Sequence, residues 1–284
     1  MPVFEGRGVK LYYEDQGVGQ PVVFVHGTVC DCRAWFAQTD ALSSEFRTIA
    51  YSRRYARPNE RQGDVMDSTV QNNCADLEAL IKGLNLDKVH LVGHSYGGFI
   101  AAYFATKAPE FLRSLTLINA AVFTMIASGR SAGASFSLLL KSPSVALSTR
   151  KLVNAVDATV KAVDKGDKSA AEKIFVKALE DGRTGLPAKP KGFSEMVAEN
   201  AGTLKETTAP FPQLTAEEAK NIKTPTLVIR GGLSALWDLR ISELLSSSIP
   251  SCQSAEIPGA GHFCLMEKPG EVNDLIRKFL RSHL

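Results

Sequence analysis

The sequence has little of what marks membrane proteins, disulfide-rich secreted proteins and metalloproteins. It contains no run of about 18 apolar residues, so we expect no membrane span. Its five cysteines are odd in number and scattered, which predicts reduced thiols rather than a disulfide framework. It has no C-x-x-C pair and no close histidine partners of the kind that bind zinc, so we expect neither a metal nor another cofactor.

Strong charge of either sign is also absent. The net charge is +3, and the basic residues form one short cluster at Arg53, Arg54 and Arg57. Nucleic-acid-binding domains carry a larger and more clustered positive charge. We therefore expect a small-molecule substrate as the partner, rather than nucleic acid or a membrane. The oligomeric state stays open, with a homodimer as one possibility.

The ends of the chain bear on its location in the cell. The first residues do not form the basic and then apolar pattern of a secretory leader, so we expect a cytoplasmic protein. The last three residues, Ser282, His283 and Leu284, resemble the S-K-L peroxisomal address. Two interpretations of this ending stay open: a peroxisomal address, if the source is eukaryotic, or an ordinary helix end.

What the chain does have is the composition and rhythm of an α/β protein. Of its 284 residues, 44% are hydrophobic and 22% are charged, as in globular proteins. Short β-branched runs alternate with longer amphipathic stretches, which is typical of a mostly parallel sheet with crossover helices. The expected strands are residues 9–13, 22–25, 48–51, 89–92, 115–118, 226–229 and 254–257, and the expected helices are 70–84, 99–107 and 272–280.

The strand rhythm breaks in the middle of the chain. From about residue 120 to 213 the sequence has no clear strand pattern, and its apolar patches at 136–140, 152–163 and 174–179 have helical spacing. We predict a core made of residues 1–119 and 214–284, with residues 120–213 inserted as a helical lid.

A candidate nucleophile follows the expected strand at 89–92. Gly93, Ser95 and Gly97 form the pattern G-x-S-x-G directly after that strand and before a helical run. A serine on such a strained turn projects its hydroxyl from the sheet edge, and side chains at the two glycine positions would collide with neighbouring backbone. The motif and its position together predict a catalytic serine at Ser95.

The remaining parts of an acyl-transfer site can be placed around this serine. The developing negative oxygen needs two N–H donors, which we assign to the amide of Tyr96 and, in the loop after the strand at 22–25, to Thr28. Of the five histidines, His262 lies in a small-residue loop after the last strand and before the last helix. This order along the chain predicts His262 as the general base.

Three motifs together resemble the α/β-hydrolase superfamily, in its lid-bearing branch of esterases, lactonases, epoxide hydrolases and C–C hydrolases. The motifs are residues 25–28 (VHGT), 93–98 (GHSYGG) and 258–262 (PGAGH). The resemblance covers the whole chain and implies a mostly parallel eight-stranded sheet flanked by helices, with an inserted helical lid. It also implies an acyl-enzyme on Ser95, because epoxide and haloalkane chemistry uses an aspartate at that position.

The chain departs from the family pattern at the acid of the triad. The family's carboxylate lies just past the strand at 226–229, but the first carboxylate there is Asp238. The family's alternative position follows the strand at 115–118, where the chain has Asn119. The third member is therefore Asp238 if the loop folds back, Asn119 as a neutral orienter of the imidazole, or absent.

A second departure concerns the loop after the strand at 48–51. The family usually has an aspartate followed by glycines there, whereas this chain has Arg53 and Arg54. These arginines are interpreted either as a clamp for a substrate carboxylate or as part of a solvated basic loop.

Substrate-contacting residues are expected among the apolar side chains of the lid, for example Phe123 and Met125, since ligand pockets are mostly apolar. We predict a serine hydrolase that cleaves a small to medium, largely apolar ester or lactone. Two other functions stay open on the same scaffold. One is a lyase, cyclase or isomerase of secondary metabolism in which His262 moves protons without an acyl-enzyme, and the other is a non-enzymatic ligand-binding protein.

Overall fold

A central sheet organises the molecule. The structure is a computed structural model and describes residues 2–59, 64–126, 142–181 and 183–284. Its eight strands lie in the order β1-β2-β4-β3-β5-β6-β7-β8. The strands are β1 (Val3–Gly6), β2 (Val9–Gln16), β3 (Pro21–Val25), β4 (Arg47–Tyr51), β5 (Val89–His94), β6 (Leu112–Ile118), β7 (Thr226–Gly231) and β8 (Cys252–Ile257).

The sheet is mostly parallel, as the sequence predicts. β1 pairs with β2 and β2 with β4 in antiparallel fashion, and all the later neighbours are parallel. All six residues of β5 are buried, which is the pattern of a strand covered on both faces. Strand β1 was not predicted, because its four residues alternate between exposed and half-buried and lack a continuous apolar run.

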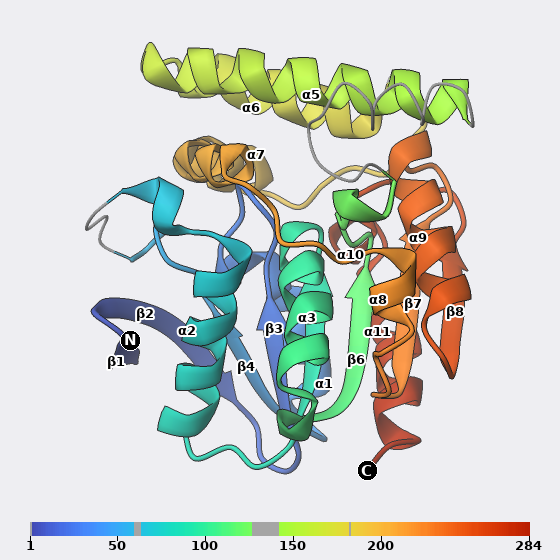
Figure 1. The fold of residues 1–284 in the computed structure, drawn as a ribbon. Coiled ribbons are helices and arrows are strands. Elements are labelled where there is room, and N and C mark those ends of the chain that lie inside the picture. The colour runs from blue at the N-terminus through green and yellow to red at the C-terminus, as the bar shows by residue number, and fades with distance from the viewer. Residues whose placement is uncertain (1, 60–63, 127–141, 182) are drawn as a thin grey trace.

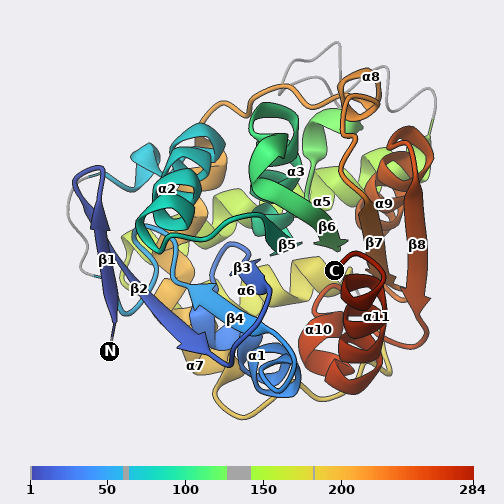
Figure 2. The same cartoon turned by 90° about the horizontal axis from the view of Figure 1, so that it is seen from below.

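Helices cover both faces of this sheet. Figure 2, which looks from below, shows α2, α3 and α9 on one side of the strands and α1 and α11 on the other. The described helices are α1 (Phe36–Leu42), α2 (Val70–Gly83), α3 (Tyr96–Lys107), α5 (Pro143–Asp164), α6 (Lys168–Glu180), α7 (Phe193–Asn200), α8 (Ala216–Ala219), α9 (Leu236–Ser248), α10 (Cys264–Glu267) and α11 (Pro269–Arg281). The short 3-10 helices are η1 (Cys32–Trp35), η2 (Val65–Asp67), η3 (Pro109–Phe111), η4 (Phe123–Met125) and η5 (Ala201–Thr208).

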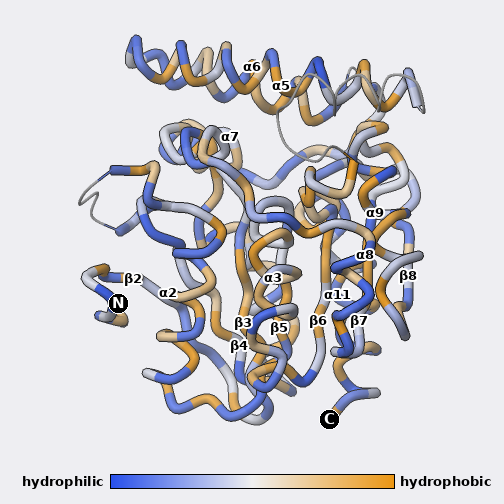
Figure 3. The backbone as a smooth tube through the Cα atoms, in the orientation of Figure 1, coloured by the Kyte–Doolittle hydropathy of each residue, from blue (hydrophilic) through white to orange (hydrophobic). Residues whose placement is uncertain are grey.

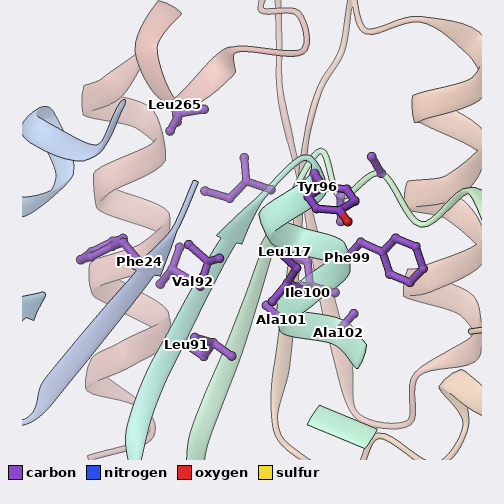
Figure 4. Packing of buried hydrophobic residues seen from close by; sticks show 14 of the residues in the cluster. Phe24, Leu91, Val92, Tyr96, Phe99, Ile100, Ala101, Ala102, Leu117 and Leu265 are labelled. Atoms are coloured by element: carbon purple, nitrogen blue, oxygen red, sulfur yellow. The ribbon is translucent and has the colours of Figure 1, made fainter. Parts of the chain in front are cut away.

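The core lies between the central strands and the helices beside them. Phe24 of β3 and Val92 of β5 are fully buried, as are Phe99 and Ile100 of α3. Figure 4 shows Ile100 facing the strands from α3, Phe99 on the side of α3 that faces away from them, Phe24 beside the other face of the sheet, and Tyr96 at the upper end of α3. The hydropathy colouring of Figure 3 shows α3 as mainly hydrophobic, whereas α5 and α6 alternate between polar and apolar along their length. The core therefore fixes α3, and with it the turn that precedes α3.

The middle of the chain is helical where the structure describes it. The expected patches at 152–163 and 174–179 lie in α5 and α6, and the patch at 136–140 falls outside the described residues. Figure 1 shows α5, α6 and α7 above the end of the sheet toward which the strand arrows point. Helix α5 contacts α9 and η5, and α6 contacts α7. The division into a core (1–119 and 214–284) and a lid (120–213) stays a prediction.

Candidate active site

Ser95 lies on a strained turn between β5 and α3. Its backbone has φ +53° and ψ −121°, a conformation that non-glycine residues rarely adopt. The glycines two residues away make the turn possible. A Cβ on Gly93 would lie 2.5 Å from the carbonyl oxygen of Gly97, and one on Gly97 would lie 2.1 Å from that of Val25. No side chain fits at either position, which explains the G-x-S-x-G spacing.

His262 lies in the loop between β8 and α10, and its ring faces Ser95. Its Nε2 is 3.0 Å from the Ser95 hydroxyl oxygen, and the residue is almost fully buried. The two residues are 167 positions apart in the chain. They meet because β5 and β8 are both parallel strands of one sheet, so the loops after them emerge at the same edge.

The carboxylate of Asp238 contacts the other side of the imidazole. Its Oδ2 is 2.7 Å from His262 Nδ1, and the aspartate side chain is fully buried. Asp238 is in the first turn of α9, which begins five residues after β7 ends. The loop after β7 therefore folds back toward His262, which is the condition under which the sequence allowed Asp238 to reach the imidazole. Since Nδ1–H donates to this carboxylate, Nε2 is the ring atom that accepts the hydrogen bond from the Ser95 hydroxyl.

Asn119 does not contact the imidazole but the carboxylate behind it. Its Nδ2 donates to Asp238 Oδ2 at 2.8 Å and to the Ser234 hydroxyl at 2.8 Å. Its Oδ1 accepts from the amide of Gly231 at 3.2 Å and from the thiol of Cys264 at 3.2 Å. Of the alternatives from the sequence, the structure therefore places Asp238 against the ring, whereas Asn119 contacts Asp238 and does not orient the imidazole directly.

Two further groups fix the loop that carries His262, and sequence reasoning missed both. Nε2 of His94 is 2.9 Å from the carbonyl oxygen of His262, and the amide of Gly261 donates to Glu267 Oε2 at 2.6 Å. Burial lowers the pKa of His94 to about 3, so this ring is neutral at pH 7. The neutral ring donates to the backbone carbonyl. The sequence offered no signal for either contact, because both depend on how distant loops pack.

The two predicted oxyanion donors have no acceptor in the described part of the chain. The amides of Thr28 and Tyr96 make no backbone or side-chain hydrogen bond there, and a first-turn amide such as that of Tyr96 has no intrahelical partner. The next amide along, that of Val29, donates to the Thr203 hydroxyl at 3.0 Å. The Val29 amide already has an acceptor within the chain and is therefore not available to an oxyanion. Gly27 lies against Ser95, since a Cβ on Gly27 would be 2.9 Å from that of Ser95.

Neither interpretation of the arginine loop was right. Arg53 is 1% exposed and forms a bidentate ion pair with the buried Glu206. Arg54 forms a bidentate pair with the buried Asp76, with both N–O distances at 2.6 Å. Both guanidinium groups are thus paired within the chain and are neither a substrate clamp nor a solvated loop. Their partners follow from tertiary packing, which the sequence pattern around residue 53 does not encode.

An aromatic cluster adjoins the imidazole. The ring of Trp237 is 5.6 Å from that of His262, and the ring of Phe123 is 5.0 Å from Trp237. Phe211 stacks on Phe123 at 6.4 Å. Met125 is half-buried and packs against the core. Substrate contact by Phe123 and Met125 stays a prediction. In this cluster the ring of Trp237 lies between those of Phe123 and His262.

Within residues 2–59, 64–126, 142–181 and 183–284, no three His, Cys, Asp or Glu side chains come together in a way that could hold a metal ion. None of the helices in these same ranges combines the length and apolar character that crossing a bilayer requires.

Comparison with known proteins identifies the family. The model of the α/β-hydrolase fold matches residues 20–269. The chain is 25% identical over 284 residues to a protein named carbamate hydrolase RutD of Azorhizobium caulinodans, with 98% of each chain covered. It is 26% identical to the structure of a thermophilic esterase from Thermogutta terrifontis, with a TM-score of 0.66 and 99% of this chain and 97% of that one covered. An esterase from Exiguobacterium antarcticum superposes with a TM-score of 0.76 over 96% of each chain at 19% identity, which shows the shared fold.

The chain belongs to the α/β-hydrolase family and is an enzyme of that family. The fold class and the family predicted from the three motifs are confirmed.

Proposed function

We propose that the chain is a serine hydrolase that cleaves a carboxylic ester or lactone through an acyl-enzyme on Ser95. One observation carries the proposal: an unbroken series of hydrogen bonds joins the Ser95 hydroxyl, the imidazole of His262 and the carboxylate of Asp238. The amides of Thr28 and Tyr96, which lack acceptors among the described residues, complete the set that acyl transfer requires.

Each atom of the reaction has a partner in this arrangement. Ser95 Oγ bonds to the carbonyl carbon of the substrate while its proton passes to His262 Nε2. The carbonyl oxygen becomes an oxyanion that accepts from the two amides. When the C–O bond to the leaving group breaks, Nε2 returns the proton to the departing alkoxide. A water molecule then attacks the acyl-enzyme by the same route and releases the carboxylic acid.

Asp238 has two tasks in this scheme. Its hydrogen bond to Nδ1 fixes the tautomer in which Nε2 accepts a proton, and its negative charge stabilises the imidazolium that forms. The side chains of Asp238 and His262 are almost completely buried, so solvent screens their interaction little.

The substrate class follows from the surroundings of the base. The almost fully buried Trp237 lies next to His262, and the half-buried Phe123 packs on Trp237, so the surroundings are apolar and favour a small to medium, largely apolar acyl or alcohol group. The relative from Thermogutta terrifontis is named an esterase, which agrees with this class of substrate.

Turnover and covalent labelling test the proposal together. The protein is incubated with p-nitrophenyl acetate and butyrate, and separately with a fluorophosphonate probe, alongside the variant Ser95→Ala. We expect turnover and labelling in the wild type and neither in the variant. Labelling without turnover favours a non-hydrolytic enzyme or a ligand-binding protein. If the wild type shows neither activity, the proposal is refuted.

A further inference from the structure

The buried pair of Arg53 and Glu206 lies directly behind the oxyanion loop, residues 26–29. Nη1 and Nη2 of Arg53 donate to the two carboxylate oxygens of Glu206, at 2.9 and 2.7 Å. Both side chains are essentially inaccessible to solvent, at 1% and 0% exposure. Burying an ion pair costs more in desolvation than a well-packed apolar pair would, so this pair needs an explanation beyond stability.

Nη1 of Arg53 also donates to Asn73 Oδ1 at 3.3 Å, and the other donors of this residue reach the oxyanion loop itself. Nε donates to the carbonyl oxygen of His26 at 3.0 Å, and Nη2 donates to that of Gly27 at 3.3 Å. The backbone amide of Arg53 donates to His26 Nε2 at 2.9 Å. That bond leaves the His26 proton on Nδ1, which donates to the same Gly27 carbonyl at 2.8 Å. Two donors therefore converge on one carbonyl oxygen.

The carbonyl of Gly27 belongs to the same peptide group as the amide of Thr28. Because a peptide group is planar and trans, its C=O and N–H point in opposite directions. Fixing the oxygen of Gly27 therefore fixes the direction in which the Thr28 N–H points. Hydrogen bonds to that oxygen also polarise the group and strengthen the N–H as a donor.

The second oxyanion donor is connected to the same guanidinium. The Arg53 guanidinium carbon lies 5.0 Å from the centre of the Tyr96 ring, in cation–π contact. The Tyr96 hydroxyl donates to the carbonyl of Ser68 at 3.1 Å, and the Ser68 hydroxyl donates to Glu206 at 2.6 Å. One closed network thus contacts both residues whose amides would face the oxyanion.

We propose that Arg53, oriented by Glu206, is a positioning residue that sets the Thr28 amide for oxyanion stabilisation. Glu206 belongs to η5, far from residue 53 in the chain, so the geometry of the oxyanion loop depends on the docking of the segment at 201–208. Thr203 of the same segment, which accepts from the amide of Val29, adds a second link. The inference rests on the proposed serine hydrolase chemistry.

Two single variants and one double variant test the inference. Glu206→Gln turns one carboxylate oxygen into an amide NH₂, which then faces donors of Arg53 or Ser68. Arg53→Lys keeps the charge but loses the planar fork that reaches both carbonyls. The double variant R53M/E206L removes both charges together, a change that buried pairs tolerate better than the loss of one partner.

The matched controls are Arg54→Lys and Asp76→Asn. They alter a buried bidentate pair one residue further along that has no hydrogen bond to residues 26–29. In the three test variants we expect kcat on p-nitrophenyl butyrate to fall about 10- to 100-fold, since loss of one oxyanion donor costs about 10²–10³-fold. KM stays within about twofold, because the amide acts on the transition state. Inhibition by a trifluoromethyl ketone weakens by the same factor as kcat.

Equal losses of kcat in the controls, or unchanged kcat in all three test variants, would overturn the inference. A second measurement needs no turnover. Hydrogen exchange of the peptide covering residues 26–33 is expected to be faster in the test variants than in the controls, and unchanged exchange also overturns the inference. If the wild type has no Ser95-dependent turnover, the proposed function fails, and this exchange measurement alone decides whether Arg53 positions the loop.

Discussion

Replacing Asp238 by asparagine removes the negative charge beside His262 while preserving the shape of the side chain. Two donors point at the same oxygen of Asp238: His262 Nδ1 at 2.7 Å and Asn119 Nδ2 at 2.8 Å. The other oxygen, Oδ1, is buried and has no hydrogen-bond partner among the described residues. The introduced amide therefore places its oxygen toward both donors and its NH₂ in the position of Oδ1. The imidazole keeps the tautomer that accepts the Ser95 proton, so the variant isolates the effect of charge.

The size of that effect follows from Coulomb's law. Unit charges about 4 Å apart interact by about 4 kcal/mol at an effective dielectric constant of about 20. The carboxylate makes this contribution only when the ring is protonated, which happens in the transition state. Its loss raises the barrier by about 4 kcal/mol, so kcat should fall about 10³-fold. Asp238→Ala also removes the acceptor that orients the ring, and its kcat should fall by about 10⁴-fold or more, as in serine-protease triads.

Steady-state kinetics on p-nitrophenyl butyrate at pH 7 measure both variants, with thermal unfolding as a check on folding. The control is Asp76→Asn, which makes the same chemical change at a buried carboxylate that pairs with Arg54 instead of with the imidazole. We expect kcat of the control to stay within about threefold of the wild type, as for changes outside the site. A loss of less than about tenfold in Asp238→Asn would refute the assignment of Asp238 as the stabilising acid, because the charge term alone predicts far more.

Two further predictions concern the nucleophile turn and the buried histidines. Gly27→Ala places a Cβ 2.9 Å from that of Ser95 and should lower kcat at least about 10²-fold. The control Gly270→Ala places a Cβ with no atom within 4 Å and should leave kcat unchanged, and steady-state kinetics of the two variants test this difference. Burial lowers the pKa of His90 to about 4 and that of His94 to about 3. As pH falls, each of these histidines is protonated in the unfolded chain before it is protonated in the folded protein. Each therefore lowers the free energy of unfolding by about 1.4 kcal/mol per pH unit below about pH 6.5. Urea unfolding at several pH values from 7 to 5 gives the free energy of unfolding, which should fall less steeply with pH in His90→Asn than in the wild type. An equal pH dependence in the two proteins would contradict this reasoning.

Local sequence determined the framework of the site. The turn at Ser95 is encoded by Gly93 and Gly97, whose neighbours leave no room for a Cβ, so the motif can be recognised without knowing the rest of the fold. Buried strands were also predictable from local sequence, since continuous apolar runs such as residues 22–25 of β3 report burial on both faces. The order of strands and helices then implied that the loops carrying Ser95 and His262 meet at one sheet edge.

Contacts between distant segments were not predictable in this way. Whether Asp238 or Asn119 faces the imidazole depends on the direction in which α9 leaves β7, and the structure places both side chains in one hydrogen-bonded group. Arg53 shows the same limit more strongly, because it lies in the loop after β4 and its partner Glu206 is 153 positions away in η5. A charged side chain in the sequence predicts solvent exposure unless its counter-charge is known.

The sequence by itself thus determined the family, the turn at Ser95 and the placing of His262 at the same sheet edge, since each depends on residues that are neighbours in the chain or on the order of the elements. Tertiary structure alone decided which carboxylate meets the ring, that Arg53 is buried, and that both arginines are paired with carboxylates of this chain. The physical reason is that the free energy of a buried charge depends on partners within a few ångströms in space. Those partners come from segments that only folding brings together.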